Sequence, residues 1–476
     1  MISLRHRGFF VLACIVAIAA GPMPAPASVA GSHSHAVAGH RVPDARSTPI
    51  AVFNAASQKR DAVQPLIART KAFPLISRDQ QIASYGLSQA VAPPDTMVAA
   101  GPTLLFELVN RTASVWSKTG ARVALANLDT ALPLPAGYTV ADPRVLYDAA
   151  SGRFFMSMNW GNSSNDSITF VAVSKTSDPR GGFNGYALSP TTNGTLHDQP
   201  KIGVTDDKVV IEWDDFAPGS VYTGTEIWVL QKSAMLAGGS VPMSSFGPAL
   251  GYLSAVPAQS LTSTTTAYAV HDSGSTAVVV QITGTPALNN VVFTTSIIGI
   301  PAVASPPPAA QPGGPALNTG DIRFFSAVWR AGQLWLAANA ACTQGSVQHA
   351  CMRIVDIATG STPTLANSFN VSPTGYDAFY PAVVTDPVGR LWVAFTASNA
   401  STYASAVAAE ITFSGTTPTV SYSLFMAGVK TYNDTLWGDF SSISIDPSTG
   451  SIWAAAEYAP SGSAANWGTA AGSFSP

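Results

Sequence analysis

The chain has 476 residues, 46% of them hydrophobic and only 11% charged, and its formal net charge is −3. A chain without an excess of basic residues offers no attractive field to a nucleic-acid backbone, which argues against nucleic acid as a partner. The 39 Gly and 35 Pro residues are typical of strand-rich proteins with many turns and argue against a helical bundle.

The first thirty residues follow the order of a secretory signal peptide. Arg5 and Arg7 precede an apolar run over residues 8–20, and Ala27 and Ala30 offer cleavage sites. We therefore predict a signal peptide over 1–30 and a secreted protein, extracellular or periplasmic, that has no membrane association once the signal is removed. A retained anchor is the alternative, but the apolar run is shorter than the about 20 residues that cross a bilayer.

Residues 31–80 show no sustained hydrophobic period. They are rich in Ala, Ser, Pro and His, so we predict a flexible lead-in to the folded domain. His33, His35 and His40 lie in this stretch, where they could hold a metal ion loosely or simply belong to a solvated tail.

Two cysteines remain when Cys14 of the signal is set aside. Cys342 and Cys351 lie between two strand-like segments, and in an oxidising compartment we expect them to form a local disulfide that fixes a hairpin loop. A metal site made from these cysteines and His349 is the alternative, although no second group of ligands is near in the sequence.

From Asp95 onward the chain repeats one plan, in which an acidic residue opens four short strand-like segments that are separated by turn residues. The interval from Asp198 to Asp321 holds two units, the second of which begins near Leu261 without an acid. The chain therefore contains seven units. Their length is close to that of propeller repeats, which have about 40 to 50 residues before longer loops are added. The sequence therefore predicts an all-β fold, a seven-bladed β-propeller with four strands per blade, over residues 81–476. The opening acids are Asp95, Asp142, Asp198, Asp321, Asp377 and Asp439.

The first turn of several units repeats as well. An acid opens the turn, a Gly two to four residues later accepts a positive φ, and an aromatic residue begins the return strand, as expected for a hairpin. Helical periodicity is nearly absent; only residues 232–236 predict a turn of helix, and the Pro-rich residues 301–315 predict an extended loop. The turn acids are Asp148, Asp386 and Asp446.

The last unit lacks one strand before the chain ends. We predict that the segment around Ile82 to Val91 supplies it, so that an N-terminal strand closes the ring and leaves no open sheet edge.

The unit openings, such as Asp142-Pro-Arg-Val-Leu-Tyr-Asp148 and Trp437-Gly-Asp439, resemble those of secreted bacterial β-propeller proteins of the broad sialidase-like kind. The resemblance runs from about Gly86 to Phe474 and implies the fold. Ser444 stands two places before its acid, as in the Asp-box of sialidases, but the other turns lack this residue. Neither the three-arginine clamp nor the Tyr-Glu pair of sialidases can be assigned here.

Because the first strand of each blade lines the central channel, the opening acids should form a partial ring there, beside the basic residues Arg144, Lys201 and Arg323. The arginines could hold a sugar carboxylate, while two acids with pKa values pushed apart serve as acid and base. The alternative is that each acid caps a strand by accepting backbone N–H bonds. The catalytic candidates are Asp142, Asp198, Glu212, His271, Asp439 and Glu457.

Four aromatic residues could stack on sugar rings, although packing between blades also explains them. They are Trp213, Tyr376, Tyr380 and Trp437. We expect no cofactor and no dedicated metal site; Ca²⁺ is the ion to consider, for example at the Asn162 to Asp166 loop. No G-x-S-x-G, H-E-x-x-H, P-loop or dinucleotide motif is present.

The sequence thus favours a monomeric, secreted propeller that binds carbohydrate or another extracellular ligand at the channel mouth. If it is an enzyme, a glycosidase or a polysaccharide lyase fits best, with His271 as the base of a lyase. The alternative is a non-catalytic binding or cell-surface interaction propeller.

Overall fold

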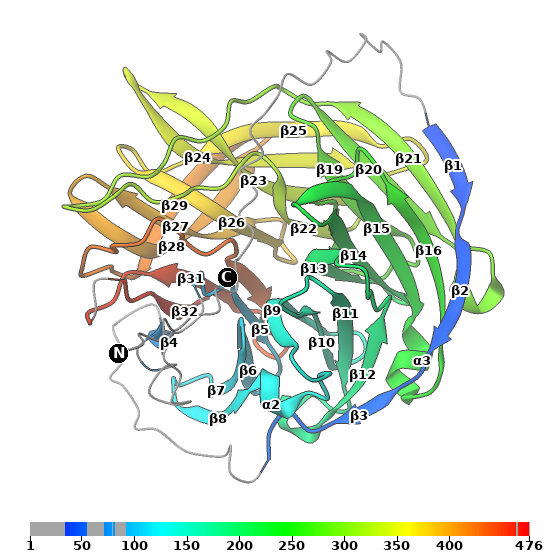
Figure 1. Ribbon diagram of the computed structural model, residues 1–476. Helices are drawn as coiled ribbons and strands as arrows, with labels where there is room; N and C mark the ends of the chain where they lie inside the picture. The colour runs from blue at the N-terminus through cyan, green and yellow to red at the C-terminus, as the bar shows by residue number, and fades with distance from the viewer. Residues whose placement is uncertain (1–33, 55–70, 79, 81–91, 463–464, 476) are drawn as a thin grey trace, which may run out of the picture.

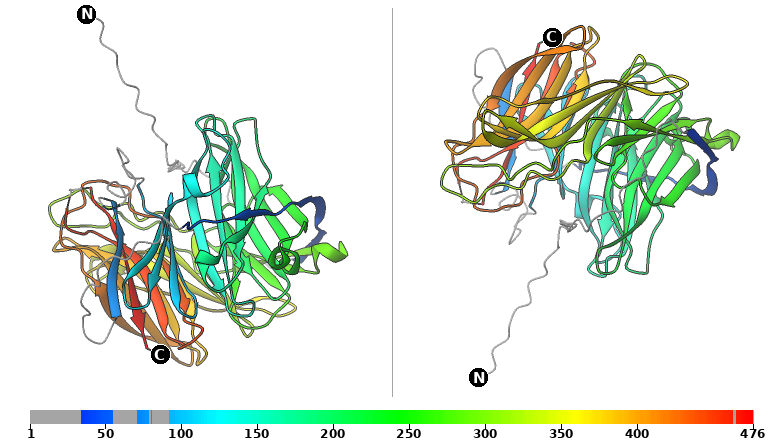
Figure 2. Two further views of the ribbon diagram at one scale, coloured as in Figure 1. Left: turned by 90° about the horizontal axis from the view of Figure 1, so that it is seen from below. Right: turned by 90° about the horizontal axis from the view of Figure 1, so that it is seen from above.

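The structure is a computed structural model that describes residues 34–54, 71–78, 80, 92–462 and 465–475. The predicted signal peptide and the predicted closing segment Ile82 to Val91 lie outside the described residues. The fold is all-β, with 59% strand and 4% helix. In the described residues the strands form seven sheets that stand around a common axis, which confirms the seven-bladed β-propeller (Figures 1 and 2).

Each blade is an antiparallel meander whose first strand lies nearest the axis. Blade 1 consists of β5 (Thr96–Ala100), β6 (Leu104–Val109), β7 (Thr112–Ser117) and β8 (Arg122–Asn127). Blade 2 consists of β9 (Thr139–Asp148), β10 (Arg153–Gly161), β11 (Ser167–Ser174) and β12 (Phe183–Leu188). Blade 3 consists of β13 (Leu196–Val204), β14 (Lys208–Ala217), β15 (Val221–Gln231) and β16 (Val241–Ala249). Blade 4 consists of β17 (Val256–Pro257), β19 (Ala267–Asp272), β20 (Thr276–Thr283) and β21 (Val292–Gly299).

The remaining blades continue the ring. Blade 5 consists of β22 (Phe324–Arg330), β23 (Gln333–Gln344), β24 (Val347–Ala358) and β25 (Thr364–Val371), and β18 (Gln259–Ser260) pairs with β22 in parallel. Blade 6 consists of β26 (Asp377–Thr385), β27 (Leu391–Asn399), β28 (Thr402–Ser414) and β29 (Thr417–Met426). Blade 7 consists of β30 (Ser442–Ile445), β31 (Ile452–Tyr458), β32 (Gly468–Phe474) and β4 (Lys71–Ser77). The fourth unit therefore begins at Val256, slightly before the predicted Leu261.

Helical segments are short. The predicted turn of helix at residues 232–236 is present as α3 (Lys232–Ala237) and ends at Gly238, whose φ of 72° caps it. The other short segments are α2 (Leu128–Ala131), η2 (Pro179–Gly181) and η3 (Pro286–Leu288).

An N-terminal strand closes the ring as predicted, but it comes from an earlier part of the chain than the sequence indicated. β4 pairs antiparallel with β32, and the hydroxyl of Thr469 accepts a bond from the Ile76 amide at 3.2 Å. The first and last parts of the chain thus share blade 7, which satisfies the outer edge of β32.

The lead-in that we expected to be flexible contains three further strands. β1 (Ser34–Ala38), β2 (His40–Ala45) and β3 (Thr48–Ile50) pair with the outermost strands of blades 4, 3 and 2 respectively. Figure 1 shows them in dark blue along the rim of the ring. The expectation was wrong because these strands form by pairing with the open edges of blades that are distant in the sequence. Such pairing requires no hydrophobic period within the strands themselves.

The repeated hairpin turns have the predicted pattern of an acid, a Gly at positive φ and an aromatic residue. Gly152, Gly389 and Gly450 have φ values of 67°, 89° and 72°, a region that side chains rarely adopt. The aromatic residues that follow them, Phe154, Trp392 and Trp453, are 0%, 5% and 3% exposed and pack between blades. These residues therefore build the fold.

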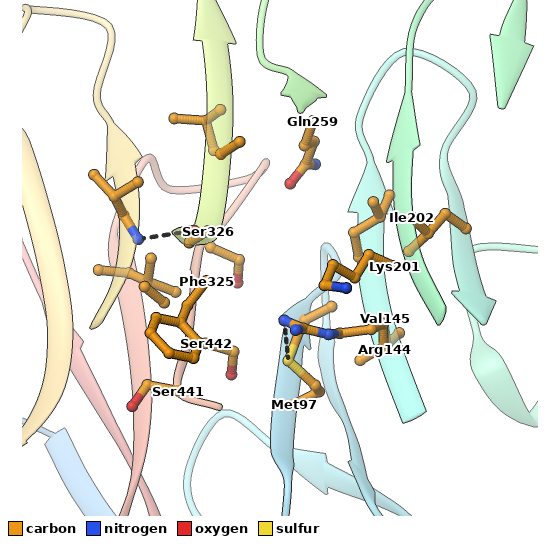
Figure 3. A pocket seen from close by; sticks show the side chains of 18 of the residues that line it. Met97, Arg144, Val145, Lys201, Ile202, Gln259, Phe325, Ser326, Ser441 and Ser442 are labelled. Carbon is orange, nitrogen blue, oxygen red and sulfur yellow. Dashed lines mark hydrogen bonds between the residues drawn. The ribbon is translucent and has the colours of Figure 1, made fainter. Parts of the chain in front are cut away.

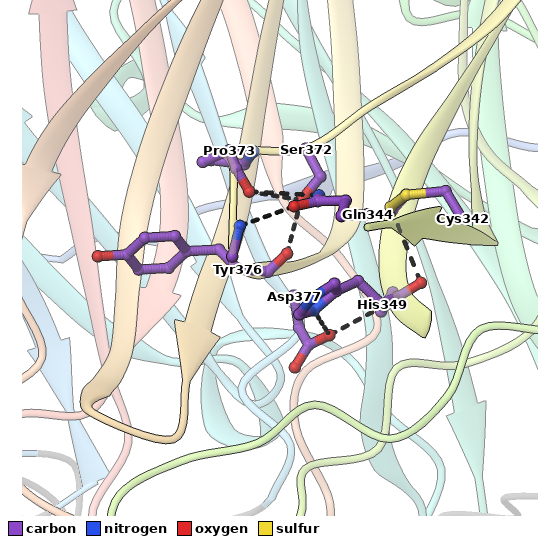
Figure 4. The surroundings of a disulfide bond; sticks show 10 residues. Cys342, Gln344, His349, Ser372, Pro373, Tyr376 and Asp377 are labelled. Carbon is purple, nitrogen blue, oxygen red and sulfur yellow. Dashed lines mark hydrogen bonds and ion pairs between the residues drawn. A yellow bond between two sulfur atoms is a disulfide. The ribbon is translucent and has the colours of Figure 1, made fainter. Parts of the chain in front are cut away.

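The predicted disulfide between Cys342 and Cys351 is present and joins β23 to β24 near the tip of their hairpin (Figure 4). Oxidised sulfurs are not available as thiolate ligands, and the Nδ1 atom of His349 instead lies 3.1 Å from the Asp377 carboxylate. The metal alternative for these cysteines is therefore not the state seen. Among the described residues, no helix is long and apolar enough to cross a membrane.

Candidate functional site

The first strands of three blades carry the same bulge near the channel opening. In each bulge, a Pro and the residue before it together lie opposite one residue of the second strand, so the pairing register shifts by one position. The residues before Pro are Asp142, Gln199 and Tyr380, with φ values of 51°, 46° and 54°. A bulge re-aims a side chain and tolerates Pro, which has no N–H to donate to the ladder.

These three conformations are costly. A residue other than Gly at positive φ costs roughly 1–3 kcal/mol and is retained only where the surrounding structure imposes it, often at functional sites. Asp95, which opens blade 1, has the same character, with a φ of 50°. Strain at equivalent points of several blades marks the channel opening as the region to inspect for function.

Carboxyl groups from several blades meet there. We call the group Asp95, Asp142, Asp198, Glu212, Asp439 and Glu457 the channel ring. The Asp439 amide donates to Asp95 Oδ1 at 3.2 Å. Gln199 connects two further members. Its backbone N–H donates to Asp142 Oδ2 at 3.4 Å, and its side-chain Nε2 donates to Asp439 Oδ2 at 3.2 Å. One glutamine of blade 3 thereby bridges carboxyls of blades 2 and 7.

Three basic residues lie beside the ring. Lys201 Nζ lies 3.0 Å from Glu212 Oε2 and also donates to the Gln199 carbonyl at 3.1 Å. The Nε of Arg323 donates to both carboxylate oxygens of Asp321, at 2.9 and 2.8 Å, and its charge also acts on Asp198 and Asp439. Arg144 makes no hydrogen bond to a carboxylate among the described residues, and its guanidinium lies over the Phe440 ring, 3.4 Å from the centroid.

Burial dominates the electrostatics of the ring. It raises the pKa of Asp95 well above the ordinary value, and the charges of Asp439 and Asp142 raise it further. Burial raises the pKa of Asp439 to about 6, opposed by the charge of Arg323. Burial also raises the pKa of Asp142, against the charges of Arg144 and Lys201 and a bond from Gln199. Several acids of this kind in one place are typical of functional sites.

Glu212 and Glu457 are the most buried acids of the ring, at 0% and 1% exposed. Burial raises the pKa of each carboxyl well above the ordinary value. Glu457 Oε2 accepts the Gly438 amide at 2.6 Å, whereas the Oε1 atoms of both residues have no hydrogen-bond partner in the described structure.

Not every opening acid joins the ring. Asp377 accepts the amides of Ala350 and Ala310 at 3.0 and 2.9 Å and contacts His349, so it holds together the β23–β24 hairpin and the Pro-rich loop. In blade 6 the channel position is taken by Tyr380, whose pKa is raised by burial and by the charge of Asp439.

The predicted stacking residues lie mostly in the core. Trp213 is 0% exposed and stacks on His197 at 5.0 Å between centroids, and Trp437 is 1% exposed and packs edge-on against Tyr432. Neither ring presents a face to a ligand in this structure. Tyr376 lies near the disulfide hairpin (Figure 4), and its hydroxyl is 3.4 Å from the Thr402 hydroxyl.

His271 lies on β19 of blade 4. Its Nδ1 is 2.6 Å from the Leu253 carbonyl, which fixes Nδ1 as the protonated nitrogen and leaves Nε2 as an acceptor. Burial lowers its pKa, so the imidazole is neutral at pH 7. The charges of Asp214 and Arg323 act on it, which places it at the blade 4 side of the channel opening.

One polar residue of this region, Gln199, was not predicted as a site residue from the sequence, whereas Asp214 belongs to the acidic run Glu212 to Asp215 that the sequence offered as a candidate. Gln199 was overlooked because the neighbouring Asp198 was taken as the key position, although the match of Gln199-Pro-Lys201 to Asp142-Pro-Arg144 contains the signal. Asp214 accepts the Ser254 amide at 2.9 Å and the Thr225 hydroxyl at 2.5 Å, so its bonds tie blade 3 to the start of blade 4.

No group of three or more His, Cys, Asp and Glu side chains in the described part of the chain is arranged to hold a metal ion. In the loop considered for Ca²⁺, the Asp166 amide donates to Asn162 Oδ1 at 3.1 Å and Asp166 Oδ1 accepts the Gly194 amide at 3.0 Å. These bonds close the loop upon itself.

No protein-family model matches the chain, and no curated protein matches it. Solved structures do. The chain is similar to the NanB sialidase from Streptococcus pneumoniae, with 8% identity, a TM-score of 0.44, and coverage of 93% of this chain and 95% of that one. It is also similar to an endo-arabinase from Bacteroides thetaiotaomicron VPI-5482, with 11% identity, a TM-score of 0.34, and coverage of 72% and 97%.

A protein of unknown function from Dyadobacter fermentans DSM 18053 is a further match, with 12% identity, a TM-score of 0.31, and coverage of 72% of this chain and 96% of that one. At such identities and TM-scores these likenesses say nothing about activity. The function has to be argued from the channel ring itself.

Proposed function

We propose that this chain is a secreted carbohydrate-active propeller and that the channel ring is its catalytic site, of the glycosidase type. The observation that carries the proposal is the bridge made by Gln199. Its backbone N–H donates to Asp142 and its side chain donates to Asp439, so one residue contacts carboxyls from two blades that are not neighbours. Two carboxyls held a few ångströms apart in unequal environments are what glycoside hydrolysis requires.

The two acids have different surroundings. The pKa of Asp439, raised to about 6, keeps a proton available near neutral pH, which suits a general acid that protonates the glycosidic oxygen. Asp142 accepts a bond from the Gln199 amide, and the charges of Arg144 and Lys201 favour its ionised form, which suits the base or nucleophile. Arg323, on the opposite side of the ring, supplies positive charge for an acidic sugar.

A polysaccharide lyase uses the same elements differently. In that reaction Arg323 neutralises the uronate, and neutral His271 removes the proton next to the carboxylate. The lowered pKa of His271 and its position near Arg323 support this second candidate.

A non-catalytic binding propeller is the remaining alternative. The burial of Trp213 and Trp437 supports it, because these rings give no platform for a sugar. For the compartment, the disulfide between Cys342 and Cys351 supports secretion, since such bonds persist where conditions are oxidising. We propose a monomer that needs no cofactor.

A screen of the purified chain against a glycan panel tests the proposal. Release of reducing ends reports hydrolysis, and absorbance at about 235 nm reports the unsaturated product of a lyase, which follows from β-elimination. We expect product, and a loss of about 100-fold or more in turnover for Asp439→Asn, the scale of one acid or base group.

Glu107→Gln is the matched control. Glu107 is also a buried carboxyl with a raised pKa, about 7, but it lies on β6 and bonds to Trp116 at 2.8 Å and Thr469 at 2.6 Å, outside the ring. Its turnover per folded molecule should stay at the wild-type level. No product from any glycan, or an equal loss in both variants, would overturn the proposal.

A further inference from the structure

A chamber lies on the propeller axis, one level below the channel ring. It has a volume of about 90 Å³ and is lined by the first strands of all seven blades (Figure 3). Along each strand, the chamber residue follows the ring residue by two positions, as for Asp142 and Arg144 or Gln199 and Lys201, because alternate residues point to the same side.

The polar side chains that line this chamber are two cations, three serine hydroxyls besides Ser441, and the amide of Gln259. No carboxylate lines it, although carboxylates crowd the ring above. Figure 3 shows the nitrogens of Arg144 and Lys201 pointing into the space from one side, opposite Ser326 and Ser442. The lining thus contains two cations and no carboxylate, although the charges of the ring carboxyls act on Arg144.

Arg144 is the central donor. The residue is 8% exposed, and neither Nε nor Nη2 has a hydrogen-bond partner in the described structure, while Nη1 contacts only Met97 Sδ at 3.9 Å. Burial lowers the pKa of Arg144 to about 10, so it stays charged at neutral pH. A buried cation with unused N–H groups is costly unless something accepts those bonds.

The serines add donors. Ser326, Ser442 and Ser444 each accept a backbone amide of the neighbouring blade, at 3.1, 2.7 and 3.0 Å. A hydroxyl that accepts in this way still has its own proton to donate. Lys201 likewise uses two of its three protons, on Gln199 and Glu212.

A route into the chamber exists from the side opposite to the ring. A wider cavity of about 300 Å³ lies at the hairpin-turn end of the channel, and Gln259 and Ser444 line both spaces. Gln259 donates to the Tyr147 carbonyl at 2.9 Å, so its side chain is held where the two cavities meet.

We propose that the chamber is a binding site for a small inorganic anion, held by Arg144, Lys201 and the inner-strand serines. The volume accommodates a halide or a small oxyanion with some of its water. Charge-assisted bonds from a guanidinium are the strongest that a neutral-pH site can offer such an ion. The proposal is independent of whether the ring is catalytic.

Bromide locates such a site directly. Crystals of the full chain soaked in sodium bromide should show an anomalous peak inside the chamber, within about 3.5 Å of Arg144 Nε or Nη2. A chamber without a peak, or with water only, in crystals whose surface takes up bromide would overturn the proposal. This experiment uses the unaltered chain, so no variant has to fold.

Solution measurements give a second, independent test. The Tm of the wild type should rise and saturate as sodium chloride replaces sodium gluconate at constant ionic strength, since gluconate is too large to enter. Arg144→Met keeps the packing on Phe440 but removes the charge, and should raise the half-saturation concentration by about ten-fold or more.

The matched control is Arg153→Met, which removes an arginine of the same blade that bonds only to the carbonyls of Ser151 and Gly152, at 3.3 and 3.1 Å. Its chloride response should equal that of the wild type. A wild type without a saturable response, or an unchanged half-saturation in Arg144→Met, would contradict the site.

Discussion

Both ends of the inner strands carry aspartates, but the hydrogen bonding of these aspartates differs between the two ends. At the hairpin-turn end, Asp386 accepts the amides of Val388 and Arg390 at 3.0 and 2.9 Å and the Arg390 Nε at 2.7 Å. Asp446 accepts the Ser448 amide at 2.9 Å and Lys118 Nζ at 2.5 Å. Each turn carboxylate is thus fully used by its own loop and one base.

The channel ring has fewer donors. Asp439 is reached by the uncharged side chains of Gln199, at 3.2 Å, and Tyr380, and the Oε1 atoms of Glu212 and Glu457 have no partner in the described structure. The bonds from Arg390 lower the pKa of Asp386 despite its burial, whereas burial raises that of Asp439 to about 6. The number of donors, and not the residue type, separates a structural aspartate from a reactive one.

The largest expected effect is on stability at the turn. Asp446→Ala removes the carboxylate partner of Lys118, which keeps only the Pro102 carbonyl, and leaves the Ser448 amide without its acceptor. It should lower the free energy of unfolding by roughly 2–4 kcal/mol, measured by denaturant unfolding. Asp439→Asn should cost less than about 1 kcal/mol because few bonds are lost. Equal destabilisation by both would erase the distinction between the two ends.

The pH dependence of stability should differ in sign between the two ends. A raised pKa in the folded state means that folded Asp439 binds more protons than unfolded Asp439 between about pH 4 and 6, so its contribution falls as pH rises through that window. Relative to Asp439→Asn, the wild type should lose on the order of 2 kcal/mol there.

Asp386 supplies the opposite case. Its lowered pKa gives a contribution that is present above about pH 4 and is lost as the pH falls through the folded-state value. The difference in unfolding free energy between the wild type and Asp386→Asn, measured against pH, should therefore rise with pH. If this difference had the same slope as that between the wild type and Asp439→Asn, the account would be contradicted.

The bridge within the ring should have a smaller effect, seen in function only. Gln199→Met removes the bond to Asp439 at 3.2 Å while it keeps a side chain of similar length. Turnover on the glycan identified by the panel should fall by roughly five- to ten-fold, the value of one hydrogen bond of about 1 kcal/mol. An unchanged pH profile of kcat would show that Gln199 does not act through Asp439.

The smallest expected effect concerns the support of a turn acid. Arg390→Met removes the ion pairs with Asp386 at 2.7 Å and Glu410 at 3.2 Å, and the arginine side chain is 24% exposed. Solvent screens such pairs, so the loss should be about 1 kcal/mol or less in denaturant unfolding. A loss as large as that of Asp446→Ala would mean that the base, and not the turn amides, holds these hairpins.

The fold was predictable where the sequence repeats a local pattern. The acid-Gly-aromatic hairpins, such as Asp446, Gly450 and Trp453, recur at propeller spacing, and each satisfies its own turn. The outer strands β1 to β3 were not predictable in this way, and for β4 the closing role was predicted but not the residues that form it. Their hydrogen bonds go to edges of blades that lie far away in the sequence, so they carry no period of their own.

The candidate site was predictable in part. The opening acids indicated which strand ends face the channel. Asp377 is an exception, because its carboxylate accepts the Ala350 amide of the neighbouring hairpin, a contact that sequence spacing cannot reveal. Gln199 was missed because a bulge shifts the channel position by one residue, from Asp198 to its neighbour. For Trp213 and Trp437 the sequence left open stacking on a sugar or packing in the core, and the structure buries both rings.

Direct titration of Asp439 tests the central claim, that the ring carboxyls are held in a reactive state while the turn carboxyls are held in a structural one. Carbon-detected NMR of aspartate-labelled protein, with Asp439→Asn and Asp386→Asn to assign the two resonances, reports both in one experiment. We predict a midpoint near 6 for Asp439 and one below the ordinary aspartate value for Asp386. Coincident midpoints near the ordinary value of about 3.9 would contradict the account.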